Sequence, residues 1–286
     1  MLSLSTIEEA QAAVGGRNLT TAEALWFRHT ATVPDSWLYY MNVPYLFIIF
    51  NLAPLPALVM DALARSLFPS LRRFKLQPSS FVPFSFVLHC YKSVMTVFLL
   101  VVGPLQICSY PLIKFVGIRT SLPLPSIWEI LAQLTVYFII EDYGNYWIHR
   151  WLHSEWGYNN IHYKHHEFVA PTSVAAPYAH WLEILLLGFP SFVGPALVPC
   201  HMVTFWLWIA LRQIEAIDTH SGYDFPWVPT KLIPFYGGSE YHDYHHFVGA
   251  KSQSNFASVF TYCDYIYGTD KGYRYKRRVE ASRKVQ

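Results

Sequence analysis

The chain has 286 residues, of which 53% are hydrophobic, 17% aromatic and only 14% charged. Soluble domains usually carry about 25% charged residues, so this composition indicates that lipid, rather than water, is the main solvent of the chain. A formal net charge of +2, with no long basic run between aromatic residues, argues against nucleic acid as a partner. Four scattered cysteines without a C-x-x-C pair predict reduced thiols rather than a zinc ribbon or a disulfide framework.

Three apolar segments are long enough to cross a bilayer, which takes roughly 20 mostly apolar residues. They run from Trp37 to Met60, from Phe84 to Tyr110 and from Ile127 to Trp147, and prolines make the first of them irregular. Two shorter apolar stretches, Ile184–Val198 and Met202–Ile217, predict a helical hairpin that crosses the bilayer fully or in part. The sequence therefore predicts an all-α integral membrane bundle.

Basic residues set the predicted orientation of this bundle. Four of them lie between positions 65 and 75, after the first span, which places that loop in the cytosol by the positive-inside rule. The next two spans return the chain to the cytosolic face near His149, and the basic residues of Lys271–Arg278 lie on the same side. By parity the N-terminus lies in the lumen, unless the kinked first segment rests in the membrane interface.

The predicted organisation has three parts. Residues 1–125 form an N-terminal segment with membrane anchor helices, residues 126–275 form one catalytic unit, and residues 276–286 form a basic cytosolic tail. No internal repeat or low-complexity segment divides the chain further.

Histidines dominate the predicted catalytic unit. Eight of the thirteen in the chain fall into three clusters, HRWLH (His149, His153), HYKHH (His162, His165, His166) and HDYHH (His242, His245, His246). Residues three or four apart share a helix face, and neutral imidazole is the commonest metal ligand of proteins. Eight ligands exceed the four that one tetrahedral zinc takes. We therefore expect a cytosolic, histidine-rich helical cap that holds two metals, although imidazole alone does not choose among iron, zinc, copper and nickel.

Three further residues are candidates for this site. His220 opens the string HSGYD directly after the hairpin and is predicted to be a ninth ligand. Asp224, four residues on, is interpreted equally as a ligand or as a residue that orients a ligand histidine. His180 is a candidate ligand too, but a role in the substrate pocket or as a structural hydrogen-bonding residue is favoured for it. No catalytic residue outside the metal ligands is predicted.

The order H-x3-H, H-x2-H-H, H-x2-H-H after a transmembrane segment resembles the fatty acid hydroxylase superfamily of membrane di-iron enzymes. Within it, DTHSGYDFPW (Asp218–Trp227) and GGSEYHDYHH (Gly237–His246) are similar to sterol C4-methyl oxidases. GRNLTTAEALWF (Gly16–Phe27) and KLQPSSFVPFSFVLH (Lys75–His89) resemble the plant type that acts on 4,4-dimethylsterols. Where fatty acyl hydroxylases carry a further H-x3-H, this chain has His220-x3-Asp224, a feature that sterol oxidases share.

This resemblance implies an endoplasmic-reticulum membrane enzyme with two non-haem iron ions and dioxygen as co-substrate. It implies stepwise oxidation of a sterol 4α-methyl group, from CH3 through CH2OH and CHO to COOH. It also implies electrons from NAD(P)H through cytochrome b5 and its reductase, with the later C4-demethylation enzymes as neighbours. The chain shows no dinucleotide or haem motif of its own. The basic tail is interpreted either as a patch that attracts an acidic electron donor or as an anchor against anionic lipid.

Other interpretations stay open. A related hydroxylase or desaturase acting on a different sterol or an acyl lipid would carry the same clusters. A histidine-rich metal transporter would need ionisable residues well inside its spans, and we expect none there. A zinc hydrolase typically uses three ligands and a glutamate base, fewer histidines than this chain offers.

Eight aromatic residues near the clusters are predicted to line a substrate slot or to form an interfacial belt: Tyr143, Trp147, Trp151, Phe168, Tyr178, Trp181, Phe225 and Trp227.

Overall fold

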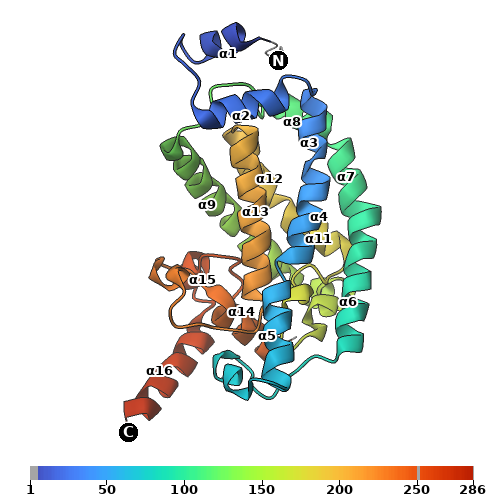
Figure 1. The fold of residues 1–286 in the computed structure, drawn as a ribbon. Helices are drawn as coiled ribbons and strands as arrows, with labels where there is room; N and C mark the ends of the chain where they lie inside the picture. Colours follow the sequence, from blue (N-terminus) through green and yellow to red (C-terminus); the bar gives the residue numbers. More distant parts are fainter. Residues whose placement is uncertain (1–5, 250–251, 286) are drawn as a thin grey trace.

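The computed structural model describes residues 6–249 and 252–285, and these fold into helices and loops without a β-strand, as predicted (Figure 1). The N-terminal half contains α1 (Ile7–Ala13), α2 (Thr21–Thr30), α3 (Asp35–Tyr40), α4 (Asn42–Leu52), α5 (Leu55–Arg65), η1 (Pro69–Phe74), α6 (Phe84–Val97), η2 (Phe98–Val102), α7 (Gly103–Cys108) and α8 (Tyr110–Val116). The C-terminal half contains α9 (Ile127–Leu152), α10 (Glu155–Asn160), η3 (His162–Glu167), η4 (Ser173–Ala175), α11 (Trp181–Gly188), α12 (Pro190–Leu197), α13 (Met202–Thr219), η5 (Pro229–Leu232), α14 (Gly238–Val248), α15 (Tyr262–Tyr267) and α16 (Lys271–Val285).

Two helical runs are long and apolar enough to cross a membrane. They are Asp35–Arg65, which joins α3, α4 and α5, and Phe84–Cys108, which joins α6, η2 and α7. Only 17% of the most apolar window of each is buried within the protein, so most of their apolar surface faces outward. A core helix of a soluble protein would bury that surface, whereas a bilayer would cover it. The two runs coincide with the first two predicted spans, and they indicate that the protein is associated with a membrane.

The third predicted span differs from the other two. It belongs to α9, which begins after the N-cap Ser126 and runs beyond position 147 to Leu152. This helix is not among those apolar enough to cross a membrane. The reason lies in its second half, where Glu141, Asp142 and Asn145 are all buried inside the protein. The middle of the bundle is therefore more polar than the sequence interpretation allowed.

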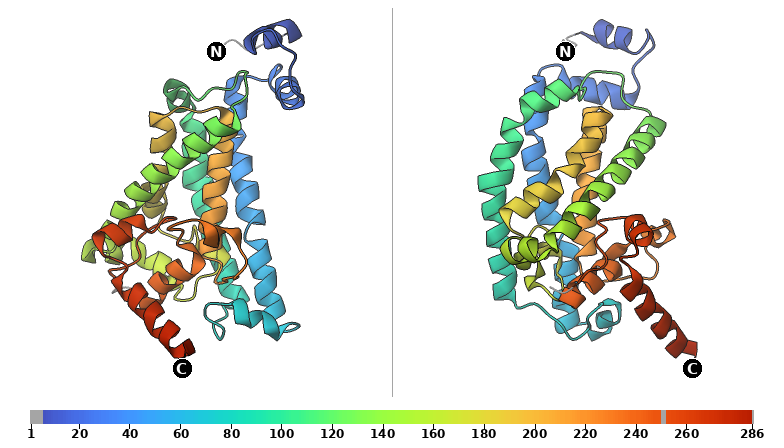
Figure 2. Two further views of the ribbon diagram at one scale, coloured as in Figure 1. Left: turned by 90° about the vertical axis from the view of Figure 1, so that its left-hand side faces the viewer. Right: turned by 180° about the vertical axis from the view of Figure 1, so that it is seen from behind.

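The predicted hairpin is present as α11 and α12 followed by α13. Its tip is fixed by two backbone hydrogen bonds, from Arg119 N to Cys200 O (3.0 Å) and from Met202 N to Arg119 O (2.8 Å). Arg119 follows the second membrane run and α8, so the hairpin extends from the histidine-bearing end of the bundle to the opposite end. The two further views in Figure 2 show α13, in orange, running along the bundle beside the other long helices.

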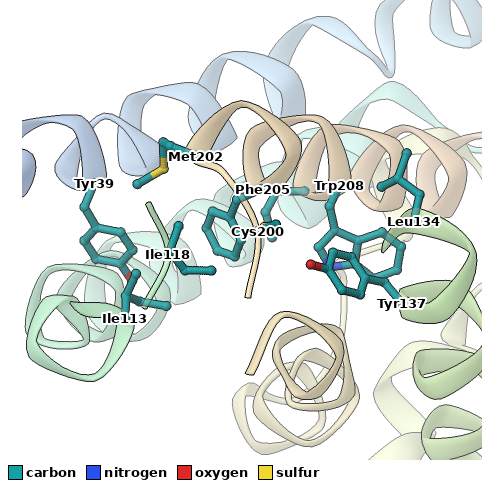
Figure 3. Packing of buried hydrophobic residues seen from close by; sticks show 10 residues of the cluster. Tyr39, Ile113, Ile118, Leu134, Tyr137, Cys200, Met202, Phe205 and Trp208 are labelled. Carbon is teal, nitrogen blue, oxygen red and sulfur yellow. The ribbon is translucent and has the colours of Figure 1, made fainter. Parts of the chain in front are cut away.

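Elements from both predicted parts of the chain share one buried core. Figure 3 shows Tyr39 and Ile113 of the N-terminal half in the same cluster as Tyr137 of α9 and Phe205 and Trp208 of α13. This core lies in the half of the bundle away from the histidines. The domain boundary at residue 125 stays a prediction. Side chains from before and after this boundary pack together in the same core.

A polar clamp fixes the N-terminal half to the chain around His220. Lys75 Nζ and Tyr223 Oη both contact Asp61 Oδ1, at 2.8 and 2.7 Å. Backbone hydrogen bonds add to the clamp, from Leu76 N to Gly222 O (2.9 Å) and from Asp224 N to Phe74 O (2.8 Å). The loop after the first membrane run therefore helps to position a residue of the site.

The close packing of α9 against α12 generates a first prediction. A Cβ atom on Gly194 would lie 2.7 Å from Tyr137 Cδ1 and 3.0 Å from Tyr137 Cα, so Gly194→Ala should force the two helices apart. We expect it to lower the free energy of unfolding by about 1–3 kcal/mol. The matched control is Gly188→Ala on α11, where nothing lies within 4 Å of the new Cβ. Thermal unfolding in detergent compares the two, and equal melting temperatures would contradict this packing.

Candidate metal centre

The structure brings all nine predicted histidines together at one end of the bundle. They form two groups, in each of which the ligand nitrogens lie within 4.8 Å of one another. The first group is His149, His153, His162, His166 and His245, and the second is His165, His220, His242 and His246. All but His242 are at most 7% exposed. Both groups draw on α14 and η3, while α9 serves only the first group and His220, at the end of α13, only the second.

In the first group, five Nε2 atoms surround one point. His162 Nε2 lies 3.2 Å from that of His149, 3.0 Å from that of His153 and 3.1 Å from that of His166. His245 Nε2 closes the group from the other side, 3.0 Å from His153 and 3.2 Å from His166. The i, i+4 pairs of α9 and η3 thus act as the sequence spacing predicts, and His162 is paired with His166 rather than His165.

The second group repeats this arrangement with four imidazoles. His220 Nε2 lies 3.2 Å from His165 Nε2 and 2.9 Å from His242 Nε2, and His246 Nε2 lies 3.1 Å from His242 Nε2. His165 of the second group directly precedes His166 of the first, and His246 of the second directly follows His245 of the first. One turn of η3 and one turn of α14 therefore each supply ligands to both groups.

In two of these Nε2 contacts, His149 with His162 and His165 with His220, no hydrogen bond forms, because both rings hold their proton on Nδ1. A neutral imidazole carries a single N–H, and a carbonyl oxygen only accepts. Five Nδ1 atoms lie against backbone carbonyls: His149 at Phe256 (2.9 Å), His165 at Tyr178 (3.4 Å), His220 at Ala216 (2.7 Å), His245 at Ser254 (2.7 Å) and His246 at Phe168 (2.9 Å). The proton of each of these rings therefore sits on Nδ1, and Nε2 presents a bare lone pair to the centre of its group.

Lone pairs that converge in this way repel one another unless a cation lies between them, so the two groups form a site for metal ions. Ligands bound to one metal at about 2.1 Å lie about 3.0–3.4 Å apart, and the separations of 2.9–3.2 Å are of this size. Five nitrogens exceed a tetrahedral set. The residues therefore fit metals of higher coordination number, and the donor set suits iron among others.

Burial keeps these imidazoles neutral and ready to bind metal. It lowers the pKa of His149 and of His220 to about 4, and that of His153 to about 2. A protonated imidazole cannot bind a metal, so at neutral pH protons compete little for these nitrogens.

Carboxylates outside the two groups orient the ligands, and sequence reasoning missed them. Glu183 Oε1 accepts the Nδ1 proton of His162 at 2.8 Å, an arrangement that fixes the tautomer of a metal-ligating histidine. Asp142 accepts hydrogen bonds from Val259 N (2.9 Å) and Phe260 N (3.0 Å), which holds the loop whose Phe256 carbonyl orients His149. The signal for Glu183 was its isolation as the one acidic residue in the apolar run 181–197.

Two predicted candidates do not join either group. Asp224 forms an ion pair with Lys231 Nζ at 2.6 Å. His180 is the N-cap of α11, where its Nδ1 accepts a hydrogen bond from Leu182 N at 3.3 Å. The non-ligand role favoured for His180 and the two roles considered for Asp224 stay predictions.

A cavity of about 780 Å³ opens beside the metal centre, within the size range of ligand pockets. It is lined by His149, His162, His165, His220 and His242 at one end and extends between α9, α11, α12 and α13 toward α7 and α8. Its walls are mostly aliphatic. None of the eight aromatic residues predicted for a substrate slot lines it. Five of them, such as Trp147 and Trp227, are largely exposed, which fits the belt interpretation instead.

The cavity wall also contains ionisable residues inside predicted spans, contrary to expectation. Arg212 Nη2 lies 2.7 Å from Glu141 Oε1, and Arg212 Nη1 lies 2.5 Å from Glu215 Oε2. All three residues line the cavity. They pair with one another instead of forming a path along the spans, so the mismatch does not favour a transporter.

Comparison with known proteins agrees with this geometry. The family model for fatty acid hydroxylase matches residues 134–269. The chain is 63% identical to methylsterol monooxygenase 1-1 and 61% identical to methylsterol monooxygenase 1-2 of Arabidopsis thaliana, over 98% of this chain and 93% of each relative. It is also 61% identical to very-long-chain aldehyde decarbonylase GL1-10 of Oryza sativa subsp. japonica, over 100% of this chain and 93% of the relative. No solved structure matches the chain.

The division into two groups predicts how metal content responds to mutation. His162→Ala with His166→Ala removes two ligands of the first group, and His242→Ala with His246→Ala removes two of the second. Each double variant should retain about half of the metal of the unmodified protein, measured by elemental analysis of purified samples. His180→Ala and Asp224→Asn are the controls and should retain all of it. Full metal content in either double variant, or none in both, would contradict two separate groups.

The lowered histidine pKa values predict a pH dependence for the metal-free protein. Between pH 6.5 and about 4, the unfolded chain takes up protons on His149 and His220 that the folded chain does not. Their contribution to the free energy of unfolding should be constant above pH 6.5 and fall below it by about 1.4 kcal/mol per pH unit for each group. Thermal melting across this range measures the slope, and His149→Gln should reduce it. A melting temperature independent of pH would argue against buried neutral imidazoles.

Proposed function

Because this chain belongs to the fatty acid hydroxylase family of oxidoreductases, we propose that it oxidises a C4 methyl group of a sterol at two non-haem iron ions. The observation that carries the proposal is the convergence of nine imidazoles, in two groups, on one end of an apolar cavity. An apolar cavity suits a sterol skeleton. Two relatives at 63% and 61% identity bear the name methylsterol monooxygenase, which supports this substrate class.

The reaction balances as three successive monooxygenations. In the first, a methyl group, O2, two electrons and two protons give the alcohol and one water. In the second, the alcohol with the same reactants gives the aldehyde and two waters. In the third, the aldehyde gives the carboxylic acid and one water. When bound, the iron ions would supply dioxygen reduction and oxidation of an unactivated C–H bond, which side chains alone do not achieve.

The residues of the chain perform the remaining tasks. His149 and its eight partners would hold the metals, and Glu183 would keep His162 in the tautomer that exposes Nε2. The aliphatic walls of the cavity bind the substrate and exclude water from the reaction. Packing of α9 against α12 sets the width of this cavity, because both helices line it.

We place the enzyme in the endoplasmic-reticulum membrane as a multi-pass protein whose metal centre faces the cytosol. The basic loop around η1 lies at the same end of the bundle as the histidines, where Gln77 Nε2 contacts Asp243 Oδ1 of α14 at 3.0 Å (Figure 1). The positive-inside rule then assigns this end to the cytosol.

Electrons would reach the metals from NAD(P)H through cytochrome b5 and its reductase, docking at the same end. The basic helix α16 leaves the bundle there, attached through Arg277 Nη1 and Glu240 Oε1 at 2.6 Å. A basic surface steers an acidic electron carrier toward it. The later enzymes of C4 demethylation are proposed as neighbours on chemical grounds, because a 4-carboxysterol must be passed on.

One observation favours a second candidate, decarbonylation of a very-long-chain aldehyde. A relative at 61% identity is named a very-long-chain aldehyde decarbonylase. The two candidates share the fold and the metal centre and differ in the occupant of the cavity and in its reaction, so substrate and product analysis separates them.

Expression in a yeast strain that lacks its own C4-methyl oxidase tests the proposal. The accumulated 4,4-dimethylsterol should disappear on expression of the chain and persist with the variant His162→Ala with His166→Ala, measured by sterol gas chromatography. Membrane extracts supplied with a long-chain aldehyde give the parallel assay. Persistent dimethylsterol with metal-loaded protein present would contradict sterol oxidation, and consumption of the aldehyde alone would select the second candidate.

A further inference from the structure

The apolar cavity contains one polar wall, close to the metal centre. It consists of Glu141, Asn145, Arg212 and Glu215, which all line the cavity. Asn145 Nδ2 donates a hydrogen bond to Glu141 Oε1 at 2.6 Å, and Arg212 bridges the two glutamates at 2.7 and 2.5 Å. We call these four residues the polar wall.

The polar wall has more hydrogen-bonding atoms than its own members satisfy. Glu141 Oε2, Asn145 Oδ1, Glu215 Oε1 and Arg212 Nε are buried and have no partner among the described residues. Glu141 is 1% exposed and Asn145 4%. A buried carboxylate or amide oxygen without a partner costs about 1–3 kcal/mol or more. Three of these four atoms are acceptors and one is a donor, a combination that suits a hydroxyl group, which both donates and accepts.

The position of the wall matches the chemistry of the proposed substrate. Glu141, Asn145 and His149 follow one another at intervals of four residues on the same face of α9, so Asn145 lies about 6 Å along the helix from the ligand. On α13, Glu215 lies about 7.5 Å along the helix before His220. In a sterol, the hydroxyl group at C3 and the methyl group at C4 are on adjacent ring carbons. A methyl group held at the metals therefore brings the hydroxyl to this region of the cavity.

We propose that the polar wall binds the C3 hydroxyl of the sterol and thereby selects the C4 methyl group for oxidation. The hydroxyl donates to a free oxygen of Glu141 or Asn145 and accepts from Arg212 Nε. This inference rests on the proposed function and adds to it the residues that determine specificity. A ketone at C3 only accepts, so it would face unpaired acceptor oxygens and be rejected.

Sterol binding to the purified, metal-loaded protein in nanodiscs, kept without an electron donor, tests this inference without relying on turnover. A 4,4-dimethylsterol, its 3-ketone and its 3-methyl ether compete for the site with a fluorescent sterol. The hydroxysterol should bind about 10- to 100-fold more tightly than either analogue, as expected for a hydrogen bond to charged groups. Equal affinities would overturn hydroxyl recognition while leaving the proposed function intact. Binding of none of the sterols would overturn both.

Replacing the ion cluster separates recognition from a merely structural role. In the triple variant Glu141→Leu, Arg212→Met, Glu215→Leu, apolar side chains of similar size replace the buried charges, a change that proteins often tolerate. The preference for the hydroxysterol over its methyl ether should fall to about one. The control is Arg119→Met with Glu129→Leu, which removes an ion pair outside the cavity (2.8 Å) and should keep the preference.

If the triple variant does not fold, judged by its melting temperature, Asn145→Leu replaces it. It should lower the preference and raise the KM for the hydroxysterol more than it lowers kcat. An unchanged preference in a folded variant of either kind would overturn the assignment.

Discussion

The structure depends on nine imidazoles whose Nε2 atoms converge in two groups at one end of the bundle. Hydrogen bonds at Nδ1, to carbonyls such as those of Phe256 and Ser254 and to the carboxylate of Glu183, fix the proton on the outer nitrogen of each ring concerned. The Nε2 atoms of two such pairs, His149 with His162 and His165 with His220, lie 3.2 Å apart with their lone pairs facing each other. A bound cation would relieve this repulsion, so metal binding would stabilise this end of the bundle.

Much of the surrounding polar structure serves to hold those outer acceptors in place. Asp142 on α9 and Asp264 on α15 both bind backbone N–H groups of the loop that carries Phe256, and that loop orients His149. The clamp between Asp61, Lys75 and Tyr223 fixes the turn beyond His220. Charged residues are rare in this chain, and many of its buried ones act on the site. Burying these charged residues costs desolvation free energy, and they hold the ligand histidines in the geometry that the site needs.

Local spacing carried most of what the sequence could predict. Apolar length identified the two membrane runs, and i, i+4 spacing identified the histidine pairs of α9, η3 and α14. What it could not predict were contacts between distant segments. Nothing in the spacing assigns His165 and His166 to different groups, places Glu183 against His162, or pairs Arg212 with Glu141 and Glu215. The sequence left the eight aromatic residues open between a substrate slot and an interfacial belt, because aromatic side chains near a site occur in both places.

The proposed centre holds two metals, each bound by neutral imidazole nitrogen, beside a cavity that admits a lipid. X-ray absorption at the iron K-edge of the purified, iron-loaded protein tests this arrangement most directly. We expect nitrogen ligands at about 2.1 Å, imidazole multiple scattering from between four and five histidines per iron on average, and no sulfur ligand. A spectrum with two or three histidines per iron, or with thiolate ligands, would contradict the assignment of the nine imidazoles to two metals.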